Sequence, residues 1–493
     1  MSLAGGGMDK YPAKAHARRT ATAMGVDTGL VVLGAAKAEN WPNSDMPRPF
    51  RQDRYFYYLT GCKEPDCYAS YDVAHDKLTL WLPPINKARV VWTGRGSTVE
   101  EALQKYDIDA AQYIHYKEVR HYGLKTVIPS IEDSVTQWVQ TQDQAGGRLY
   151  CVGGAFGQED EQMYQREMAL KRAMDACRVI KDEHEIRSIK QANEISSKAH
   201  TAVLRNLSKF TGEAEVEAQY MQVCIASRAK EQAYDPIAGA GTNASELHYV
   251  KNDEPFSHRT QLLVLDAGCE VGCYASDVTR TMPVNRRHPG YWPSEEAENT
   301  YKLVEKVQEA CIKQMKPGNT FVDIHRLAQS MIVDGLMDLG ILKGKREEIA
   351  EAGIVLGFFP HGLGHHMGLE VHDVSPSGPR PSVAGVGTLA FEPSLCRAPC
   401  VESAPTMEPG MVITVEPGVY FNRFLLETFF LCDPERSKFI GREVLRRYMG
   451  VGGVRIEDDI LITRDGHENL TMAPKGQAML DIIREGAKES RSA

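Results

Sequence analysis

Short apolar runs alternate with helical periodicities along the whole chain. Runs of four to eight apolar residues, typical of strands, occur at 29–36, 78–82, 89–93 and 261–265. Apolar residues three and four positions apart, typical of amphipathic helices, occur at 123–140, 159–177, 183–207, 213–230, 294–315 and 322–339. Further β-rich runs at 273–284, 410–420 and 453–463 precede a short terminal helix. This mixture predicts an α+β chain.

A charged stretch, KDEHE at 181–185, separates a mixed first third from the remainder of the chain. We expect it to join two domains, with the boundary near residue 180. The first seven residues, MSLAGGG, resemble an unstructured leader, and Met8 is a possible second start.

Composition places the chain among ordinary globular proteins and excludes several functions. Its 493 residues are 42% hydrophobic and 25% charged, with a formal net charge of −9. A net acidic chain lacks the positive footprint that phosphate contacts need, so we expect no nucleic-acid partner. No apolar run reaches the ~18 residues of a membrane helix, so we expect no membrane partner.

The cysteines indicate a reducing compartment. There are eleven of them, an odd number, and no secretion signal accompanies them, so we expect a cytoplasmic protein with free thiols. The pairs Cys269/Cys273 and Cys396/Cys400 lack the CxxC spacing typical of structural zinc sites. Zinc at either pair is therefore the weaker interpretation.

Two aspartates mark the first candidate site. Asp266 ends an apolar run and Asp277 follows it across a Gly-rich turn, expected at 268–272. If the turn centres between Val271 and Gly272, the two face each other across a hairpin, with Cβ atoms ~4.5–5.5 Å apart. Carboxylates that close repel unless a proton or a cation lies between them. The segment alone leaves two interpretations open, a metal site or a solvated hairpin.

The second candidate segment is rich in histidine. PHGLGHHMGLEVHD, at 360–373, places four histidines among glycines that let backbone approach a ligand. Glu416 ends an apolar run before a Pro-Gly turn, and Glu457 lies inside another β-rich run. Each glutamate alone is more often a solvated or salt-bridged carboxylate. Four carboxylates with one imidazole would favour Mn²⁺ or Mg²⁺ over thiolate-bound zinc.

Five segments in order resemble the M24B metallopeptidases, the Xaa-Pro aminopeptidase and prolidase branch with the pita-bread fold. They are LDAGCEVGCYASDVTRTMPV, MKPGNTFVDIH, PHGLGHHMGLEVHDV, ITVEPGVYF and VRIEDDILIT. PFRQDRYFYYLTGCKEPD, at 49–66, resembles the N-terminal domain of the same branch. The resemblance implies a smaller mixed α/β N-terminal domain at 8–178 and a pita-bread catalytic domain at 183–480.

The resemblance also assigns residues by motif position. It implies two divalent ions per subunit, most simply Mn²⁺, held by Asp266, Asp277, His365, Glu416 and Glu457. It assigns His248 and His372 to catalysis, and His361 and Arg455 to substrate binding. A dipeptidase of this branch carries an arginine fourteen positions before the VEPG glutamate. Here Glu402 stands there, and Arg397 is the nearest candidate for the same contact.

The expected function is that of an Xaa-Pro aminopeptidase, a dinuclear-metal hydrolase that removes the residue preceding a penultimate proline. Its partners would be proline-containing peptides and a second copy of itself, in a homodimer or higher oligomer. One alternative is a prolidase restricted to Xaa-Pro dipeptides. A methionine aminopeptidase fits less well, because of the long N-terminal segment and the VHD motif. An inactive pita-bread binding scaffold is disfavoured because the chain keeps all five ligand positions.

Overall fold

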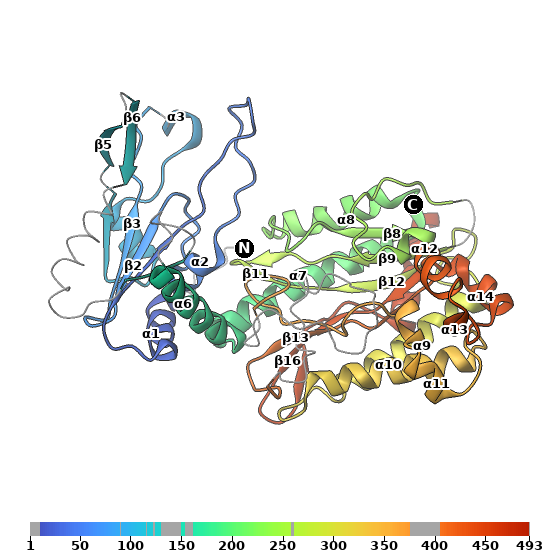
Figure 1. Cartoon of the computed structure of the whole chain (residues 1–493). Helices are drawn as coiled ribbons and strands as arrows, with labels where there is room; N and C mark the ends of the chain where they lie inside the picture. Colours follow the sequence, from blue (N-terminus) through green and yellow to red (C-terminus); the bar gives the residue numbers. More distant parts are fainter. Residues whose placement is uncertain are drawn as a thin grey trace. The chain divides into compact units, whose positions relative to one another are not determined.

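A computed structural model describes residues 10–88, 90–114, 116–121, 124–129, 149–152, 161–257, 261–374 and 405–492. The chain divides into two compact units, Met1–Arg178 and Val179–Ala493. They are coloured blue to teal and green to red in Figure 1. Within the described residues, no helix is both long and apolar enough to cross a bilayer.

The N-terminal unit is built on a five-stranded sheet in the order β4-β3-β2-β1-β7. The β1–β2 and β2–β3 pairs are antiparallel, and the outer pairs β3–β4 and β1–β7 are parallel. Its elements are α1 (Ala13–Met24), β1 (Leu30–Gly34), α2 (Arg54–Thr60), β2 (Tyr68–Asp72), β3 (Lys77–Leu82), α3 (Val90–Thr93), α4 (Val99–Lys105), β4 (Ala110–Tyr113), β5 (Tyr116–His121), β6 (Leu124–Pro129), β7 (Leu149–Val152) and α6 (Glu161–Val179).

Two expectations for this unit are wrong. The run at 89–93 was predicted to be a strand, but Val90–Thr93 form the short helix α3, where Val91 and Trp92 are more than 80% exposed. A β-rich run becomes a strand only where a neighbouring strand pairs with it, and α3 has none. The predicted helix at 123–140 begins instead as β6, paired antiparallel with β5. Residues 130–140 lie outside the described part of the chain.

The C-terminal unit surrounds small antiparallel sheets with long helices. Its larger elements are α7 (Glu183–Asn206), α8 (Glu213–Ala226), β8 (Ile237–Ala240), β9 (Gln261–Asp266), β10 (Glu270–Val271), β11 (Tyr274–Ala275), β12 (Thr279–Val284), α9 (Glu295–Ile312), α10 (Phe321–Asp338), α11 (Arg346–Glu351), β13 (Val412–Val415), β14 (Gly418–Tyr420), α12 (Arg423–Leu425), α13 (Pro434–Ser437), α14 (Arg442–Tyr448), β15 (Gly453–Arg455), β16 (Asp458–Ile462), β17 (His467–Asn469) and α15 (Gly476–Ser492). The helices predicted at 183–207, 294–315 and 322–339 are confirmed as α7, α9 and α10.

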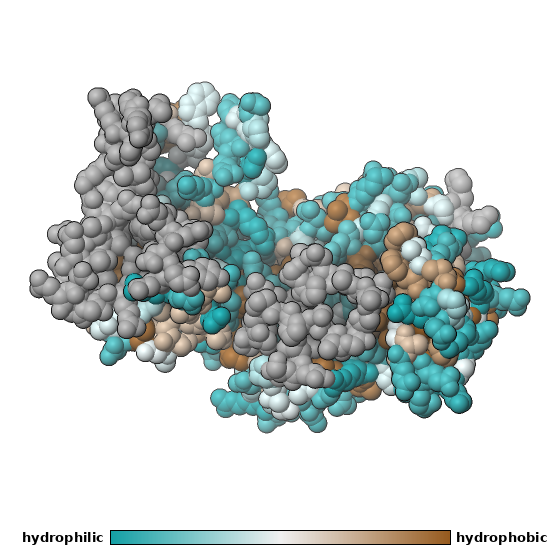
Figure 2. Space-filling model, in the orientation of Figure 1, coloured by the Kyte–Doolittle hydropathy of each residue, from teal (hydrophilic) through white to brown (hydrophobic). Residues whose placement is uncertain are grey.

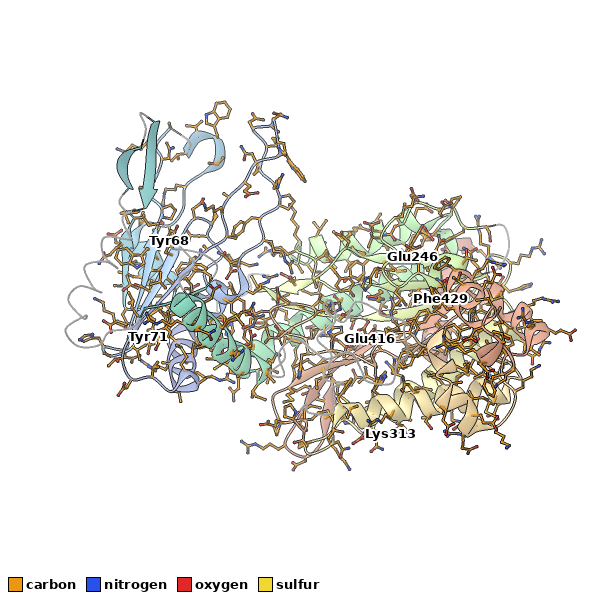
Figure 3. The ribbon with its side chains drawn as sticks, in the orientation of Figure 1. Tyr68, Tyr71, Glu246, Lys313, Glu416 and Phe429 are labelled. Carbon is orange, nitrogen blue, oxygen red and sulfur yellow. The ribbon has the colours of Figure 1, made fainter. Side chains whose placement is uncertain are left out.

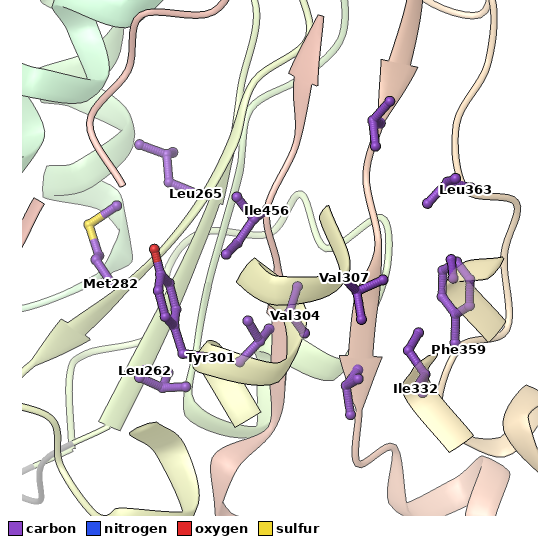
Figure 4. Packing of buried hydrophobic residues seen from close by; sticks show 14 of the residues in the cluster. Leu262, Leu265, Met282, Tyr301, Val304, Val307, Ile332, Phe359, Leu363 and Ile456 are labelled. Carbon is purple, nitrogen blue, oxygen red and sulfur yellow. The ribbon is translucent and has the colours of Figure 1, made fainter. Parts of the chain in front are cut away.

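Three sheets carry the site of this unit, in the orders β12-β9-β8, β13-β16-β17 and β14-β15. A large apolar core lies beneath them. Figure 4 shows part of that core, where Tyr301, Val304 and Val307 of α9 lie among other buried side chains, including Leu265 of β9 and Ile456 between β15 and β16.

The charged stretch at 181–185 is not a solvated linker. Asp182 caps α7 by accepting hydrogen bonds from the amides of His184 and Glu185. Lys181 is buried and its Nζ lies 3.1 Å from Asp373 Oδ2, on the histidine-rich segment. These charges therefore fix the start of the C-terminal unit.

On the face drawn in Figure 2 the described surface is mostly hydrophilic, with a brown area over the region of α12. Phe424, in α12, is 71% exposed there and stacks edge-on against Phe429.

Candidate metal centre

The two aspartates lie on one face of the β9–β12 hairpin, but not directly opposite each other. Asp266 ends β9 and pairs with Thr279, while Asp277 lies two residues before Thr279. The expected register is therefore wrong by two residues. Asp277 precedes the first residue of β12, yet both aspartates still point the same way, since each has an oxygen 2.5 Å from the Tyr234 hydroxyl. Both are more than 90% buried.

The turn explains the difference in register. Its centre is Gly272-Cys273, between Val271 and Tyr274, which pair. Both central residues have positive φ, 57° and 65°, as a two-residue type I′ hairpin requires. Positive φ at a cysteine is unusual, so the sequence favoured the glycine-rich segment at 268–272 instead. Gly268 serves another need, since a Cβ there would lie 1.7 Å from the Ser276 carbonyl oxygen.

His365 presents an imidazole lone pair to two carboxylates. Its Nδ1 lies 3.1 Å from the carbonyl oxygen of His366, which can only accept, so Nδ1 carries the proton. In the neutral ring Nε2 is then an acceptor, and it lies 3.4 Å from Asp277 Oδ2 and 3.5 Å from Glu416 Oε1. Burial lowers the pKa of His365 to about 4, so the ring is neutral near pH 7. Three acceptors facing one another favour a cation between them.

The two glutamates reach the same place from different strands. Glu416 follows β13 at the Pro-Gly turn, where Figure 3 labels it, and it lies 3.5 Å from the Thr414 hydroxyl. Glu457 lies between β15 and β16, and its Oε2 accepts a 2.7 Å hydrogen bond from Thr279. Its other oxygen, Oε1, is buried and has no hydrogen-bond partner in the described part of the chain.

The surroundings of the carboxylates disfavour their ionisation at the same time. Burial, followed by repulsion from neighbouring carboxylates, raises the pKa of Asp277, Glu416 and Glu457 well above their ordinary values. Burial also disfavours the charged form of Asp266. There, however, the Arg455 guanidinium, 2.6 Å away, leaves the pKa lowered. A bound cation would remove the conflict for the other three.

The donor atoms of this cluster fit a metal ion. Ligand atoms of Asp277, His365 and Glu457 all lie within 4.8 Å of one another. The unpaired Glu457 oxygen, the unpaired Nε2 lone pair of His365 and the mutual repulsion are what a cation would satisfy. The second ring nitrogen of His365 donates to a carbonyl, as ligating imidazoles generally do. The donor set, carboxylate oxygens with one imidazole, suits hard divalent ions.

Sequence reasoning missed Tyr234. Its hydroxyl lies 2.5 Å from both Asp266 Oδ1 and Asp277 Oδ1. A phenol has one proton, so it can donate to only one of them at a time. No spacing signal pointed to Tyr234, because it comes from a loop before β8 that shares no sequence motif with the aspartates.

A hydrogen-bonded row lies beside the ligands. Arg455 Nη1 donates to the Tyr420 hydroxyl at 3.0 Å, and that hydroxyl lies 2.9 Å from His361 Nε2. Because His361 Nδ1 faces the Gly362 carbonyl oxygen at 2.7 Å, Nε2 must accept the Tyr420 proton. Burial lowers the pKa of His361 to about 3, so this ring is neutral.

The other predicted residues have varied positions. The His372 ring lies 4.4 Å from that of His365, at 78°. His248 is exposed on the loop after β8. Arg455, predicted to bind substrate, is buried, and its guanidinium pairs with Asp266. Arg397 lies outside the described residues, as do Glu402, Cys396 and Cys400. Cys269 and Cys273 are both buried.

Comparison with known proteins shows the family of the chain. The model of metallopeptidase family M24 matches residues 187–464, and that of the aminopeptidase P N-terminal domain matches 15–122. A probable Xaa-Pro aminopeptidase of Pyrenophora tritici-repentis is 49% identical over 97% of this chain and 72% of its own length. One from Aspergillus clavatus is also 49% identical, over 97% of this chain and 94% of its own. Aminopeptidase PepP of Pseudomonas aeruginosa superimposes with a TM-score of 0.72 at 26% identity, covering 98% of this chain and all of its own.

The fold and the buried cluster together define a metal-dependent hydrolase with a pita-bread catalytic unit. The chain belongs to metallopeptidase family M24, whose model covers more than half of it. The expected family, the expected fold class and the expectation of an enzyme are therefore confirmed. The predicted class of activity, that of an Xaa-Pro aminopeptidase, is likewise confirmed by the curated relatives.

Proposed function

We propose that this chain removes the N-terminal residue from peptides whose second residue is proline, using two divalent ions bound by Asp266, Asp277, His365, Glu416 and Glu457. The observation that carries the proposal is the Nε2 lone pair of His365 facing two carboxylate oxygens at 3.4 and 3.5 Å. Buried acceptors are held that close only where a cation or proton joins them. The oxygen-rich donor set supports Mn²⁺ as the natural ion.

Cations held there would polarise the scissile carbonyl and lower the pKa of a water nucleophile toward neutrality. The protein's own groups would do the rest. Glu416, the most exposed of the five at 15% of its side chain, is placed to take the proton from the attacking water and pass it to the leaving imide nitrogen.

The histidines would act on the substrate. His248 and His372 would donate to the oxyanion that develops on the scissile carbonyl. Neutral His361, fixed by Tyr420, would contact the proline side of the substrate. Arg455 would hold Asp266 ionised rather than bind substrate, because its guanidinium is buried against that carboxylate.

Proline has no N–H to donate, so selectivity for it must come from the shape of the subsite. A prolidase restricted to dipeptides would add a cation for the substrate's α-carboxylate. Among the described residues, two buried guanidinium groups lie beside the predicted ligands, and both are already paired, Arg455 with Asp266 and Arg280 with Asp458. This favours longer peptides as substrates, with Arg397 the remaining candidate for a dipeptide contact.

Three broader expectations remain part of this proposal. The N-terminal domain would span 8–178 and the catalytic domain 183–480. The chain would work in the cytoplasm as a homodimer or higher oligomer.

Product analysis tests the proposal. The Mn²⁺-loaded protein is given an Xaa-Pro dipeptide and its Xaa-Pro-Yaa extension, and the products are identified by mass spectrometry. We expect release of the first residue from the tripeptide at least as efficiently as from the dipeptide. Strict dipeptide preference that collapses in Arg397→Ala would assign a prolidase instead. No cleavage of either peptide would refute the proposal.

A further inference from the structure

A buried carboxylate outside the metal centre gathers four hydrogen bonds. Glu213, the first residue of α8, is completely buried. Its Oε1 accepts from the amide of Ala240 at 2.8 Å and from Asn243 Nδ2 at 3.0 Å. Its Oε2 accepts from the Tyr249 hydroxyl at 2.8 Å and from the amide of Glu254 at 3.1 Å. None of these partners belongs to the metal centre.

All four donors lie in one segment, residues 240–254, which we call the His248 loop. The loop leaves β8 at Ala240 and returns to α8 at Glu254, where the Glu213 amide also donates to the Glu254 carbonyl at 3.1 Å. One carboxylate therefore closes both ends of the loop and binds its middle through Asn243 and Tyr249. Figure 3 labels Glu246 in this loop.

The same loop is held from the metal side. Arg455 Nη2 lies 3.5 Å from the Leu247 carbonyl oxygen, and the same nitrogen lies 2.6 Å from Asp266 Oδ2. His248 is thus bracketed, with its preceding residue bound to Arg455 and its following residue bound to Glu213.

We propose that Glu213 is a positioning residue for His248, holding the loop so that the imidazole faces the substrate carbonyl. The inference rests on the role proposed above for His248. An exposed side chain on a loop reaches a reacting atom reproducibly only if its backbone is fixed, and displacements near 1 Å cost about 100-fold in rate. The residues on both sides of His248 are fixed here, and Glu213 binds the one that follows it, Tyr249.

Glu213→Gln is the sharpest perturbation because it changes one atom. The carboxamide keeps one acceptor oxygen for two donors, but its NH₂ group then faces either the Glu254 amide or, with the amide flipped, the Ala240 amide. A backbone amide can only donate, so one end of the loop is released in either orientation. We expect kcat to fall roughly 10- to 100-fold, with KM and metal content unchanged.

A double-mutant cycle tests whether Glu213 acts through His248. We would measure kcat and KM for wild type, Glu213→Gln, His248→Ala and the double variant. We expect the double variant to equal His248→Ala within about twofold, because there is no imidazole left to misplace. If the losses of kcat in the two single variants multiply in the double variant, or if kcat is unchanged in Glu213→Gln, the proposal is wrong.

Two controls guard against a general loss of folding. Glu215→Gln alters a neighbouring carboxylate that caps the same helix through Thr211 and Gly212, not the His248 loop, so its kcat should match wild type. Tyr249→Phe removes one hydroxyl without a new donor, and it should show the same non-additivity with a smaller loss. An additive loss there would also count against the proposal.

Hydrogen exchange gives a readout that does not need turnover. Peptides covering 240–254 should exchange faster in Glu213→Gln, while peptides from β9 and β13 should not. Unchanged exchange in the loop would refute the positioning role. Absence of peptidase activity in the wild type would instead refute the proposed function, so the two failures are distinguishable.

Discussion

The buried pair of Lys181 and Asp373 should contribute substantially to the stability of the catalytic unit. Both side chains are only 1% exposed, and Lys181 Nζ lies 3.1 Å from Asp373 Oδ2. Asp373 follows His372 directly, and its amide donates to the His366 carbonyl at 2.8 Å. The pair therefore ties the start of α7 to the segment that carries the predicted histidines.

The expected magnitude follows from this geometry. At 3.1 Å and an effective dielectric constant of about 20, the attraction is roughly 5 kcal/mol before desolvation. Removing one partner of a buried pair costs about 3–5 kcal/mol, because the other charge is left uncompensated. We therefore expect Lys181→Met to lower the free energy of unfolding by about 3–5 kcal/mol. Lys181→Met with Asp373→Leu should recover most of that loss, because neither charge remains.

The assay must report on the catalytic unit alone, because the chain has two units. Urea-dependent hydrogen exchange read by mass spectrometry on peptides from α7 does so. The matched control is Lys190→Met, which breaks a 2.8 Å pair with Glu468 whose side chains are 42% and 48% exposed. That change should cost less than about 1 kcal/mol. A loss in Lys181→Met as small as in the control would refute the reasoning.

Three further predictions concern the centre itself. Glu457→Ala should keep the fold, bind fewer than two metal equivalents by elemental analysis and show no turnover; two bound metals with normal kcat would contradict its role. His365→Ala should lower metal affinity in a titration, whereas His372→Ala should keep its metals and lose about 10²–10³-fold in kcat; equal metal loss would refute this division. Gly268→Ala should lower the melting temperature and metal content, because its Cβ would lie 1.7 Å from a carbonyl of the facing strand, whereas Gly466→Ala, with no atom within 4 Å, should change neither.

Local chemistry in the sequence predicted the long helices of the catalytic unit and marked candidate carboxylates, whereas the choice of His365 came from the resemblance to a known family. Amphipathic periodicity predicted α7, α9 and α10 within a few residues of their observed bounds. Carboxylates directly after apolar runs, as at Asp266 and Glu416, marked strand ends where a polar group could face a site. These signals depend only on neighbours in the chain, so one sequence carries them.

The tertiary structure decided which groups meet. The hairpin register depended on a positive φ at Cys273. A cysteine disfavours that conformation, so the sequence did not indicate it and only the folded turn shows it. Tyr234 and Glu213 act on partners brought to them by folding, so neither had a sequence signal. The ion pair of Arg455 with Asp266 had no signal in the sequence either. A long side chain has several charged partners within reach, and only the folded backbone selects one.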